Sequence, residues 1–243
     1  PAANSNSDRW SFIYEIAFDP FDANKFYVAT HKGFVMTQDG GLTFTTPSGI
    51  NSALQNAPSL EVAVDPNLGH VYAQVNNNIF RSIDGGVTFT NQTGVNGLPT
   101  ANRIGRVEFA TTKSQEGLVY ACISTSGFSG TLDGIYRSDD NGTNWSLVVQ
   151  GSANGFNPLG QQGSWNIAFG IDPANPERLI IGGQLELWSV NVNGGRDLIA
   201  YWQPEIPSNP YYVHADMHNI TFHPTDPNIM YVGSDGGVSR TNN

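Results

Sequence analysis

The chain has 243 residues, enough for one large domain with a buried core. It contains 27 Gly and 14 Pro, and only 13% of its residues are charged, a composition typical of a strand-rich protein with many turns. A net charge of −10 argues against nucleic-acid binding, which needs clustered Lys and Arg, and no apolar run is long enough to enter and cross a membrane.

The first half of the chain predicts two similar groups of strands. In the first, IYEIAFDP and KFYVAT are followed by FVMT and then by LTFTT, all within about residues 10–50. In the second, about residues 58–95, LEVAVDP, HVYAQV and IFRS follow the same order. Alternating apolar residues bounded by turn residues indicate antiparallel strands, so each group is expected to form one four-stranded sheet.

The second half predicts three further groups. They cover about residues 103–150, 161–203 and 213–243. In the last group, SDGG at 234–237 aligns with the loop between the second and third strands, so the group is expected to lack its fourth strand. The sequence therefore predicts about four and a half sheets in a single domain, residues 1–243. The only cysteine, Cys122, lies in the expected strand VYACIS and is expected to be a small buried apolar side chain.

A turn motif occurs once in each of the first three groups. It reads TQDGGLTF at 37–44, SIDGGVTF at 82–89 and SDDNGTNW at 138–145. In such a turn a hydroxyl and a carboxylate can accept hydrogen bonds from backbone N–H groups, and glycine takes the positive φ. Asp39, Asp84 and Asp140 are therefore expected to hold turns, not to meet a substrate or a calcium ion.

The motif resembles the Asp-box, or BNR, repeat of β-propellers such as sialidases, xyloglucan hydrolases and sortilin-type receptors. The resemblance implies an all-β propeller of four-stranded blades. Because a propeller closes its ring to remove exposed strand edges, an incomplete fifth blade favours an arc of a larger propeller, in a processed or fragmentary chain, with further chain segments or another chain completing it.

One short stretch brings together several side chains that can bind a ligand or transfer a proton. His214, Asp216 and His218 alternate, so in an extended strand they would face the same way. That arrangement fits a hydrogen-bonded network, an acid/base pair or glycan contact, or a metal site. The stretch is similar to one in large secreted bacterial Asp-box proteins.

Other polar and aromatic positions align near the first strand of each group, at the expected mouth of a central channel. Glu15 and Glu61 come from adjacent groups, and two such carboxylates could carry out glycoside hydrolysis. With Asp216 they are the candidate catalytic residues. The candidate ligand-binding residues are His214, His218, Arg106, Trp165, Tyr14, Asp235 and Asp133. The alternative is an ordinary polar channel lining.

Three hypotheses on function remain open. The first is an extracellular or cell-surface module that binds a glycan or a protein through the loop at 124–134, the stretch 214–218 and the loop at 234–237. The second is a glycoside hydrolase with carboxylates at the channel mouth, and the third is a purely structural module. No cofactor is expected. A sialidase is disfavoured, because Arg106 is the only well-placed arginine and that family uses three.

Overall fold

The computed structural model describes residues 9–128, 130–152, 155–203 and 211–241. Contacts divide the chain into two compact units. The first comprises Pro1–Asn102, Glu116–Val119 and Ser138–Trp145, and the second comprises Arg103–Gln115, Tyr120–Arg137 and Ser146–Asn243. Residue 129 of the loop expected at 124–134 and residues 242–243 of the expected fifth group lie outside the described residues.

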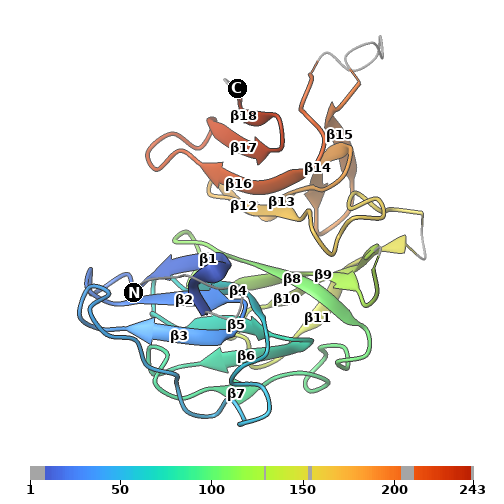
Figure 1. Ribbon diagram of the computed structural model, residues 1–243. Coiled ribbons are helices and arrows are strands. Elements are labelled where there is room, and N and C mark those ends of the chain that lie inside the picture. Colours follow the sequence, from blue (N-terminus) through green and yellow to red (C-terminus); the bar gives the residue numbers. More distant parts are fainter. Residues whose placement is uncertain (1–8, 129, 153–154, 204–210, 242–243) are drawn as a thin grey trace. The chain divides into compact units, whose positions relative to one another are not determined.

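Two antiparallel sheets lie in the first unit (Figure 1). A short 3-10 helix, η1 (Arg9–Ser11), precedes them. The first sheet consists of β1 (Ile13–Phe18), β2 (Phe26–Thr30) and β3 (Gly33–Thr37). The second consists of β4 (Ser59–Val64), β5 (Val71–Val75), β6 (Asn78–Ser82) and β7 (Thr90–Asn91). In both, each strand pairs with the one before it in the chain.

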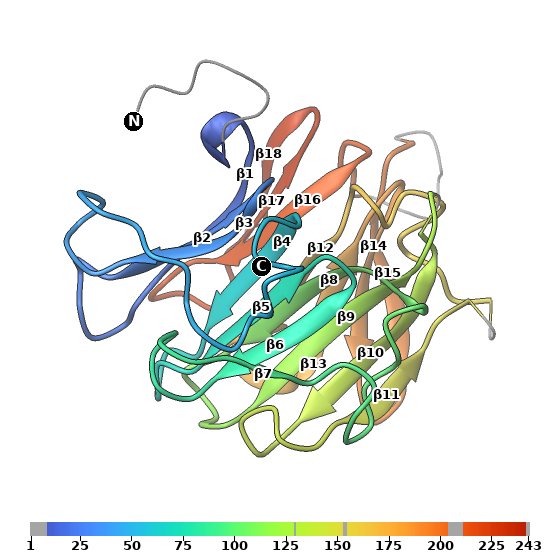
Figure 2. The ribbon, with the colours of Figure 1, turned by 60° about the horizontal axis from the view of Figure 1, so that its bottom comes forward.

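Three antiparallel sheets account for the strands of the second unit, and β8 to β11 run side by side in Figure 2. The first has β8 (Ile104–Thr111), β9 (Val119–Thr125), β10 (Leu132–Ser138) and β11 (Ser146–Gln150). The next has β12 (Ala168–Asp172), β13 (Asn175–Gly182), β14 (Glu186–Asn191) and β15 (Arg196–Tyr201). The last has β16 (Met217–Phe222), β17 (Met230–Ser234) and β18 (Gly237–Arg240).

The described residues therefore form five blade-like sheets, and the expected number of four and a half is corrected. The fifth sheet has three strands, and so does the first. After the first turn of the repeated motif, at 37–44, the segment expected as a fourth strand pairs only through an isolated bridge between Met36 and Thr45. As expected, the SDGG stretch lies at the β17–β18 hairpin.

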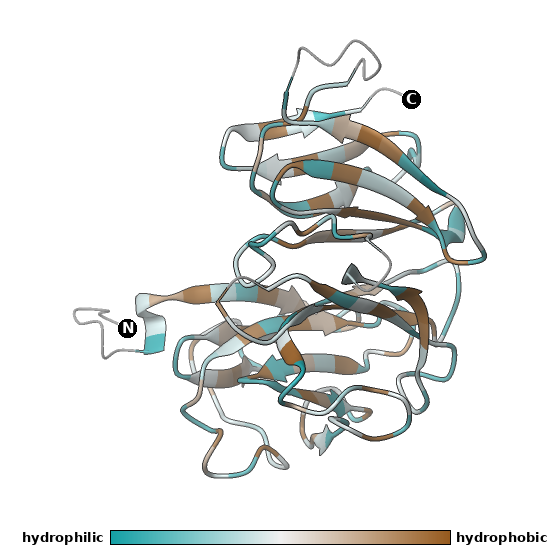
Figure 3. Cartoon of the chain, turned by 90° about the vertical axis from the view of Figure 1, so that its right-hand side faces the viewer, coloured by the Kyte–Doolittle hydropathy of each residue, from teal (hydrophilic) through white to brown (hydrophobic). Residues whose placement is uncertain are grey.

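Apolar side chains on facing sheets form the cores, and Figure 3 colours the hydrophobic residues along the strands brown. In the first unit, Tyr27 and Phe34 of the first sheet pack in one cluster with Val62 and Phe80 of the second. In the second unit, Cys122 is fully buried in β9, and this burial raises the pKa of its thiol well above the usual value.

A β-bulge recurs near the start of the first strand of three sheets. The pairing register shifts between Ile13 and Glu15, between Ser59 and Glu61, and between Met217 and Asn219. The extra residue in each case is Tyr14, Leu60 or His218. Because a bulge turns a side chain away from the regular alternation of a strand, it changes which way these positions point.

Candidate functional site

The stretch that joins the fourth sheet to the fifth is bent, not extended. Asp216 has a φ of 59°, in the left-handed region that non-glycine residues rarely adopt. Its N–H donates to the carbonyl of Gln184 (2.8 Å), and the N–H of Met217 donates to that of Gly183 (2.8 Å). The expectation that residues 214, 216 and 218 face one way is therefore wrong, since the bend breaks the strand alternation on which it depended.

The two imidazoles of this stretch have separate partners. His214 places Nδ1 2.9 Å from the carbonyl of Ala215, and its ring lies against Gly236, where an added Cβ would be 2.2 Å away. His218 places Nε2 2.7 Å from a carboxylate oxygen of Asp235, with both side chains well exposed. Across the described ranges, no group of three His, Cys, Asp or Glu side chains lies close enough together to hold a metal ion. The described residues therefore supply no set of ligands for the metal site that was considered from the sequence.

The Asp216 carboxylate is held by an amide from a neighbouring turn. Asn166, only 3% exposed, donates through Nδ2 to Asp216 (2.7 Å) and to Gln162 (2.7 Å). The N–H of Asp235 donates to the carbonyl of Asp216 (3.1 Å). Asn166 and the backbone of Asp216 thus link the turn at 162–166, the bend and the β17–β18 hairpin.

Arg106 joins the same turn from β8. Its guanidinium donates to the carbonyl of Trp165 (3.0 Å) and lies 3.6 Å from the carboxylate of Glu108. The Trp165 indole itself is 60% exposed. Arg106, which was expected to bind a ligand, therefore uses one N–H group to position the backbone of the exposed Trp165.

The long loop between β9 and β10 lies against this turn as well. Gly163 donates its N–H to the carbonyl of Gly130 (2.8 Å), and the Ser164 hydroxyl donates to that of Gly127 (2.9 Å). Phe128 on this loop is 88% exposed, which makes it a second open aromatic ring near the turn. Phe128 was not among the residues predicted from the sequence, although an aromatic residue between Gly127 and Ser129 in an inserted loop is a signal of exposure.

Asp133 belongs to β10 and is committed to local contacts. It accepts hydrogen bonds from Arg103 (2.7 Å) and from the Tyr136 hydroxyl (2.8 Å). Burial, together with this hydrogen bond, raises the pKa of Tyr136 to about 12. The side chain of Asp133 is only 8% exposed, so it has little surface that a ligand could contact.

The remaining candidates lie in the first unit, on the first strands of its two sheets. Tyr14 and Glu15 are in β1, where Tyr14 is 38% exposed. Glu61 lies in β4 and is only 3% exposed. Glu61 is thus placed inside the sheet packing and not on an open surface.

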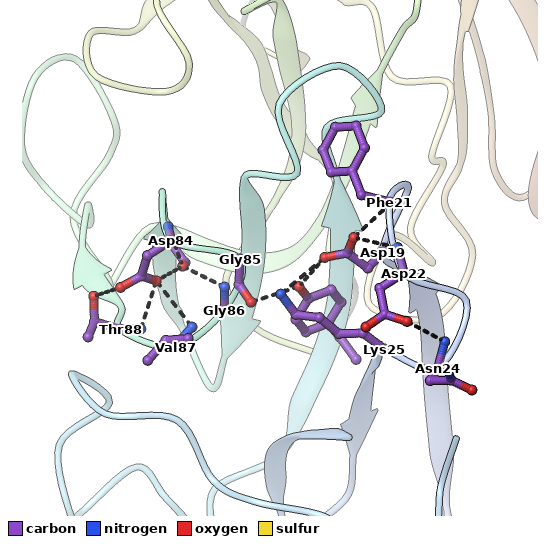
Figure 4. Close-up of polar contacts among 12 residues, drawn as sticks. Asp19, Phe21, Asp22, Asn24, Lys25, Asp84, Gly85, Gly86, Val87 and Thr88 are labelled. Carbon is purple, nitrogen blue, oxygen red and sulfur yellow. Dashed lines mark hydrogen bonds and ion pairs between the residues drawn. The ribbon is translucent and has the colours of Figure 1, made fainter. Parts of the chain in front are cut away.

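The carboxylates of the repeated turn motif, Asp39, Asp84 and Asp140, accept hydrogen bonds within their own turns. Around Asp84, one oxygen accepts from the N–H groups of Val87 (3.1 Å) and Thr88 (2.9 Å), and the other accepts from the Thr88 hydroxyl (2.6 Å), as Figure 4 shows. The Ser82 hydroxyl donates to Asp84 and accepts from Gly86. The turns of Asp39 and Asp140 repeat this pattern.

These hydrogen bonds favour the charged carboxylates. In the first turn the hydroxyl and N–H of Thr43 lower the pKa of Asp39 to about 2. In the second, burial opposes the charge, but the bonds from Thr88 and Ser82 outweigh it and lower the pKa of Asp84 to about 2. Each carboxylate is therefore an ionised hydrogen-bond acceptor at neutral pH.

No family model matches the sequence, and no curated protein matches it. Several solved structures, however, are similar to the chain. The chain is similar to YCF48 from Cyanidioschyzon merolae (TM-score 0.60, 16% identity, 97% of this chain and 69% of that chain). It is also similar to an ancestral GH74 enzyme (TM-score 0.62, 14% identity, 97% and 31%) and to the extracellular domain of a one-component system of B. thetaiotaomicron (TM-score 0.65, 12% identity, 99% and 28%).

At these identities the likeness shows the fold alone, which is that of a β-propeller. The chain spans about a third or less of the length of the GH74 enzyme and of the B. thetaiotaomicron protein. In the described part of the chain, no helix has both the length and the apolar character needed to cross a bilayer.

Proposed function

We propose that this β-propeller chain is a binding module whose second unit carries a glycan-binding surface. The surface consists of Phe128, Trp165, His218 and Asp235, and the turn at 162–166 holds its parts together. The observation that carries the proposal is the pairing of two highly exposed aromatic rings with an exposed imidazole–carboxylate pair on hydrogen-bonded loops. Sugars are recognised by stacking on aromatic faces together with hydrogen bonds to polar groups.

The hydrogen bonds among these loops support a preformed site. Asn166 is buried while the neighbouring Trp165 is open, so the turn is anchored on one side and presents its indole on the other. Groups fixed before a ligand arrives lose little entropy on binding, and this preorganisation favours affinity. The candidates His214, Arg106 and Asp133 are then positioning residues behind the surface, and Tyr14 is no part of it.

Glycoside hydrolysis is the second candidate, and the fold shared with a GH74 enzyme favours considering it. A hydrolase needs two carboxyl groups about 5–10 Å apart across a pocket. The candidate acids here have other partners, since Asp216 accepts from Asn166 and Asp235 pairs with His218. Glu61 is buried in β4, and these placements favour binding over turnover.

We place this module outside the cell or on its surface. The support is the similarity to an extracellular domain, together with the net charge of −10 and the low content of charged residues. The Asp-box turns would then be the scaffold that holds the blades, with Asp39, Asp84 and Asp140 as structural residues.

A glycan panel tests the proposal directly. Binding of the intact protein to immobilised plant, microbial and sialylated glycans would be compared with that of Trp165→Ala and Phe128→Ala. Each variant should weaken binding by roughly 2- to 13-fold, because an aromatic contact contributes about 0.5–1.5 kcal/mol. Phe21→Ala, which removes a 70% exposed ring from the first unit, is the matched control and should bind normally.

The same samples separate binding from catalysis. Reducing-sugar release would be measured alongside, with Asp216→Asn and Glu61→Gln. Turnover that is lost in either variant would replace the binding proposal with a hydrolase. Binding that is equal in Trp165→Ala, Phe128→Ala and Phe21→Ala would contradict the assigned surface, and binding only to a protein ligand would change the class of partner.

A further inference from the structure

A hollow of about 470 Å³ lies beside the fourth sheet, in the second unit. Its walls come from β14, from β15 and from the chain at 155–157. The side chains that line it include Phe156, Glu186, Trp188 and Arg196. Its volume lies within the range of small-molecule pockets, about 300–1,000 Å³, so the hollow has room for a ligand.

The hollow lies on the face of the fourth sheet that does not pack on the fifth sheet. Leu187 of β14 belongs to a core cluster with Met217 and Val232 of the fifth sheet. Its neighbours in β14, Glu186 and Trp188, point to the opposite face, because side chains alternate along a strand. The hollow is therefore separate from the contact between the fourth and fifth sheets.

Phe156 supports the two side chains that face the hollow. It is only 6% exposed, and the Cζ atom of Arg196 lies 4.2 Å from the centroid of its ring. The Trp188 ring meets the Phe156 ring edge-on, with centroids 5.5 Å apart. The next residue, Asn157, accepts a hydrogen bond from the N–H of Leu132 in β10 (2.9 Å), which ties this loop to the third sheet. The aromatic base is thus in place before a ligand arrives.

The Arg196 guanidinium is available to an anion. Among the residues that the structure describes, no carboxylate pairs with Arg196, and the residue is exposed. Its contact with the Phe156 ring uses the face of the guanidinium and leaves N–H groups at the edge. A planar guanidinium can form two parallel hydrogen bonds to a carboxylate. The hollow therefore offers a place for one carboxylate group.

Glu186 and Trp188 supply contacts that suit a sugar. The Trp188 indole N–H donates to Oε2 of Glu186 (2.8 Å), which fixes both side chains. The other oxygen, Oε1, accepts no hydrogen bond from any described residue, and it can accept one from a sugar hydroxyl. The Glu186 carboxylate repels a doubly charged phosphate more than a singly charged carboxylate. An acidic sugar therefore fits these groups better than a phosphorylated one.

We propose that this hollow is a binding site for a sugar that carries a carboxylate, such as a uronic acid. Arg196 donates two N–H groups to the carboxylate, and the Trp188 ring packs against the sugar ring. Glu186 accepts a hydrogen bond from a hydroxyl group of the sugar. The inference does not depend on the proposed glycan surface, because the hollow shares no lining residue with that surface.

Nuclear magnetic resonance of the tryptophan indole N–H groups tests the site in the intact protein. The chain has five tryptophans, and the Trp188 signal would be assigned from its loss in Trp188→Phe. Methyl glucuronide is the probe, and it should shift this signal saturably because it contacts the indole. Methyl glucoside, which has CH2OH in place of the carboxylate, should bind on the order of tenfold more weakly, since the bidentate charged pair is lost.

Variants of Arg196 test the role of the guanidinium. Arg196→Gln should weaken methyl glucuronide binding to the level of methyl glucoside. Arg196→Lys keeps the charge without the planar fork, so it should retain only part of the affinity. Lys113→Gln is the matched control, because it removes one positive charge from another exposed residue of the second unit, and it should bind normally. Circular dichroism would establish that the variants are folded.

Four results would overturn the proposal. The first is no shift of the Trp188 signal with methyl glucuronide, and a shift of the Trp165 signal alone would place the acidic sugar on the proposed glycan surface. The second is equal binding of methyl glucuronide and methyl glucoside. The third is equal affinity of folded Arg196→Gln and Lys113→Gln. The fourth is binding of acetate or alanine as tight as that of methyl glucuronide, which would indicate a site for small anions or amino acids.

Discussion

At the scale of single residues, the repeated turn motif shows how two polar side chains hold a hairpin turn in place. In the second turn, Ser82 and Asp84 accept hydrogen bonds from four backbone N–H groups, those of Asp84, Gly86, Val87 and Thr88. The carboxylate of Asp22, by comparison, accepts one backbone hydrogen bond, from the N–H of Asn24 (2.9 Å). Ser82 and Asp84 together therefore hold more of their turn than Asp22 holds of its loop.

We expect Asp84→Ala to destabilise the protein by roughly 0.5–2 kcal/mol, the range found when a capping side chain is removed. Asp22→Ala is the control and should cost less, because it loses a single exposed bond. Urea unfolding of the two variants and the parent protein measures the difference. A smaller loss in Asp84→Ala than in Asp22→Ala would contradict the structural role.

Acid should weaken the same turns. The folded pKa values of Asp39 and Asp84 are lowered to about 2, well below the usual range for an aspartate. A carboxyl group with a lowered folded pKa binds protons less readily than in the unfolded chain, so its contribution is complete above about pH 4 and is lost as the pH falls towards 2. Unfolding midpoints measured between pH 5 and pH 2 should fall, and less so in Asp84→Asn.

At the scale of elements, glycines let the turns approach the neighbouring sheet closely. Gly86 has a φ of 82°, and a Cβ on it would lie 2.4 Å from the ring of Tyr27 in the first sheet. The Tyr27 hydroxyl donates to the carbonyl of Gly85 (2.8 Å). The second turn is therefore fixed to the sheet before it by a close contact that only glycine allows.

Gly86→Ala should destabilise the first unit more than Gly40→Ala does. Both positions have a similar positive φ, but a Cβ at Gly40 would meet only a side-chain oxygen of Asn24, at 3.5 Å. Gly40→Ala thus measures the backbone strain alone, on the order of 1 kcal/mol, and Gly86→Ala adds the clash with Tyr27. Equal unfolding free energies in the two variants would show that the ring of Tyr27 moves aside at little cost.

The strands and hairpins were largely predictable from the sequence, and the candidate site was not. Alternating apolar residues and the repeated motif located the five groups of strands, because both signals are local. The bend at Asp216 and the bulge at His218 depend on hydrogen bonds to residues far along the chain, such as Gln184. The pattern HADMH therefore could not show that its polar side chains point to different partners.

At the scale of the whole molecule, what repeats is the manner in which one sheet packs on the next within a unit. Between the third and fourth sheets, the Tyr120 hydroxyl donates to the carbonyl of Pro176 (3.0 Å), and Arg137 pairs with Glu177 (2.6 Å) while lying over the Tyr120 ring. Between the first and second sheets, the Tyr27 hydroxyl also donates to a carbonyl of the following sheet, that of Gly85 in the turn between β6 and β7. Blade packing thus combines a buried ring with a polar tip that reaches the following sheet.

A double-mutant cycle on Arg137→Met and Glu177→Gln measures this packing. Both side chains are partly buried, with 16% and 29% exposed, so their coupling should be roughly 1 kcal/mol, at the upper end for surface pairs. The unfolding free energies of the two single variants and the double variant give that coupling. A coupling near zero would mean that the apolar contacts alone hold these two sheets together.

Because Cys122 is fully buried, its reaction with a thiol reagent can report how often the second unit opens. Its thiol has a raised pKa and no access to solvent, so a thiol reagent should modify the folded protein only after β9 separates from its neighbours. With one cysteine in the chain, the labelling rate counts a single kind of event. Adding a glycan that binds the second unit should slow that rate in proportion to how far the glycan stabilises this unit.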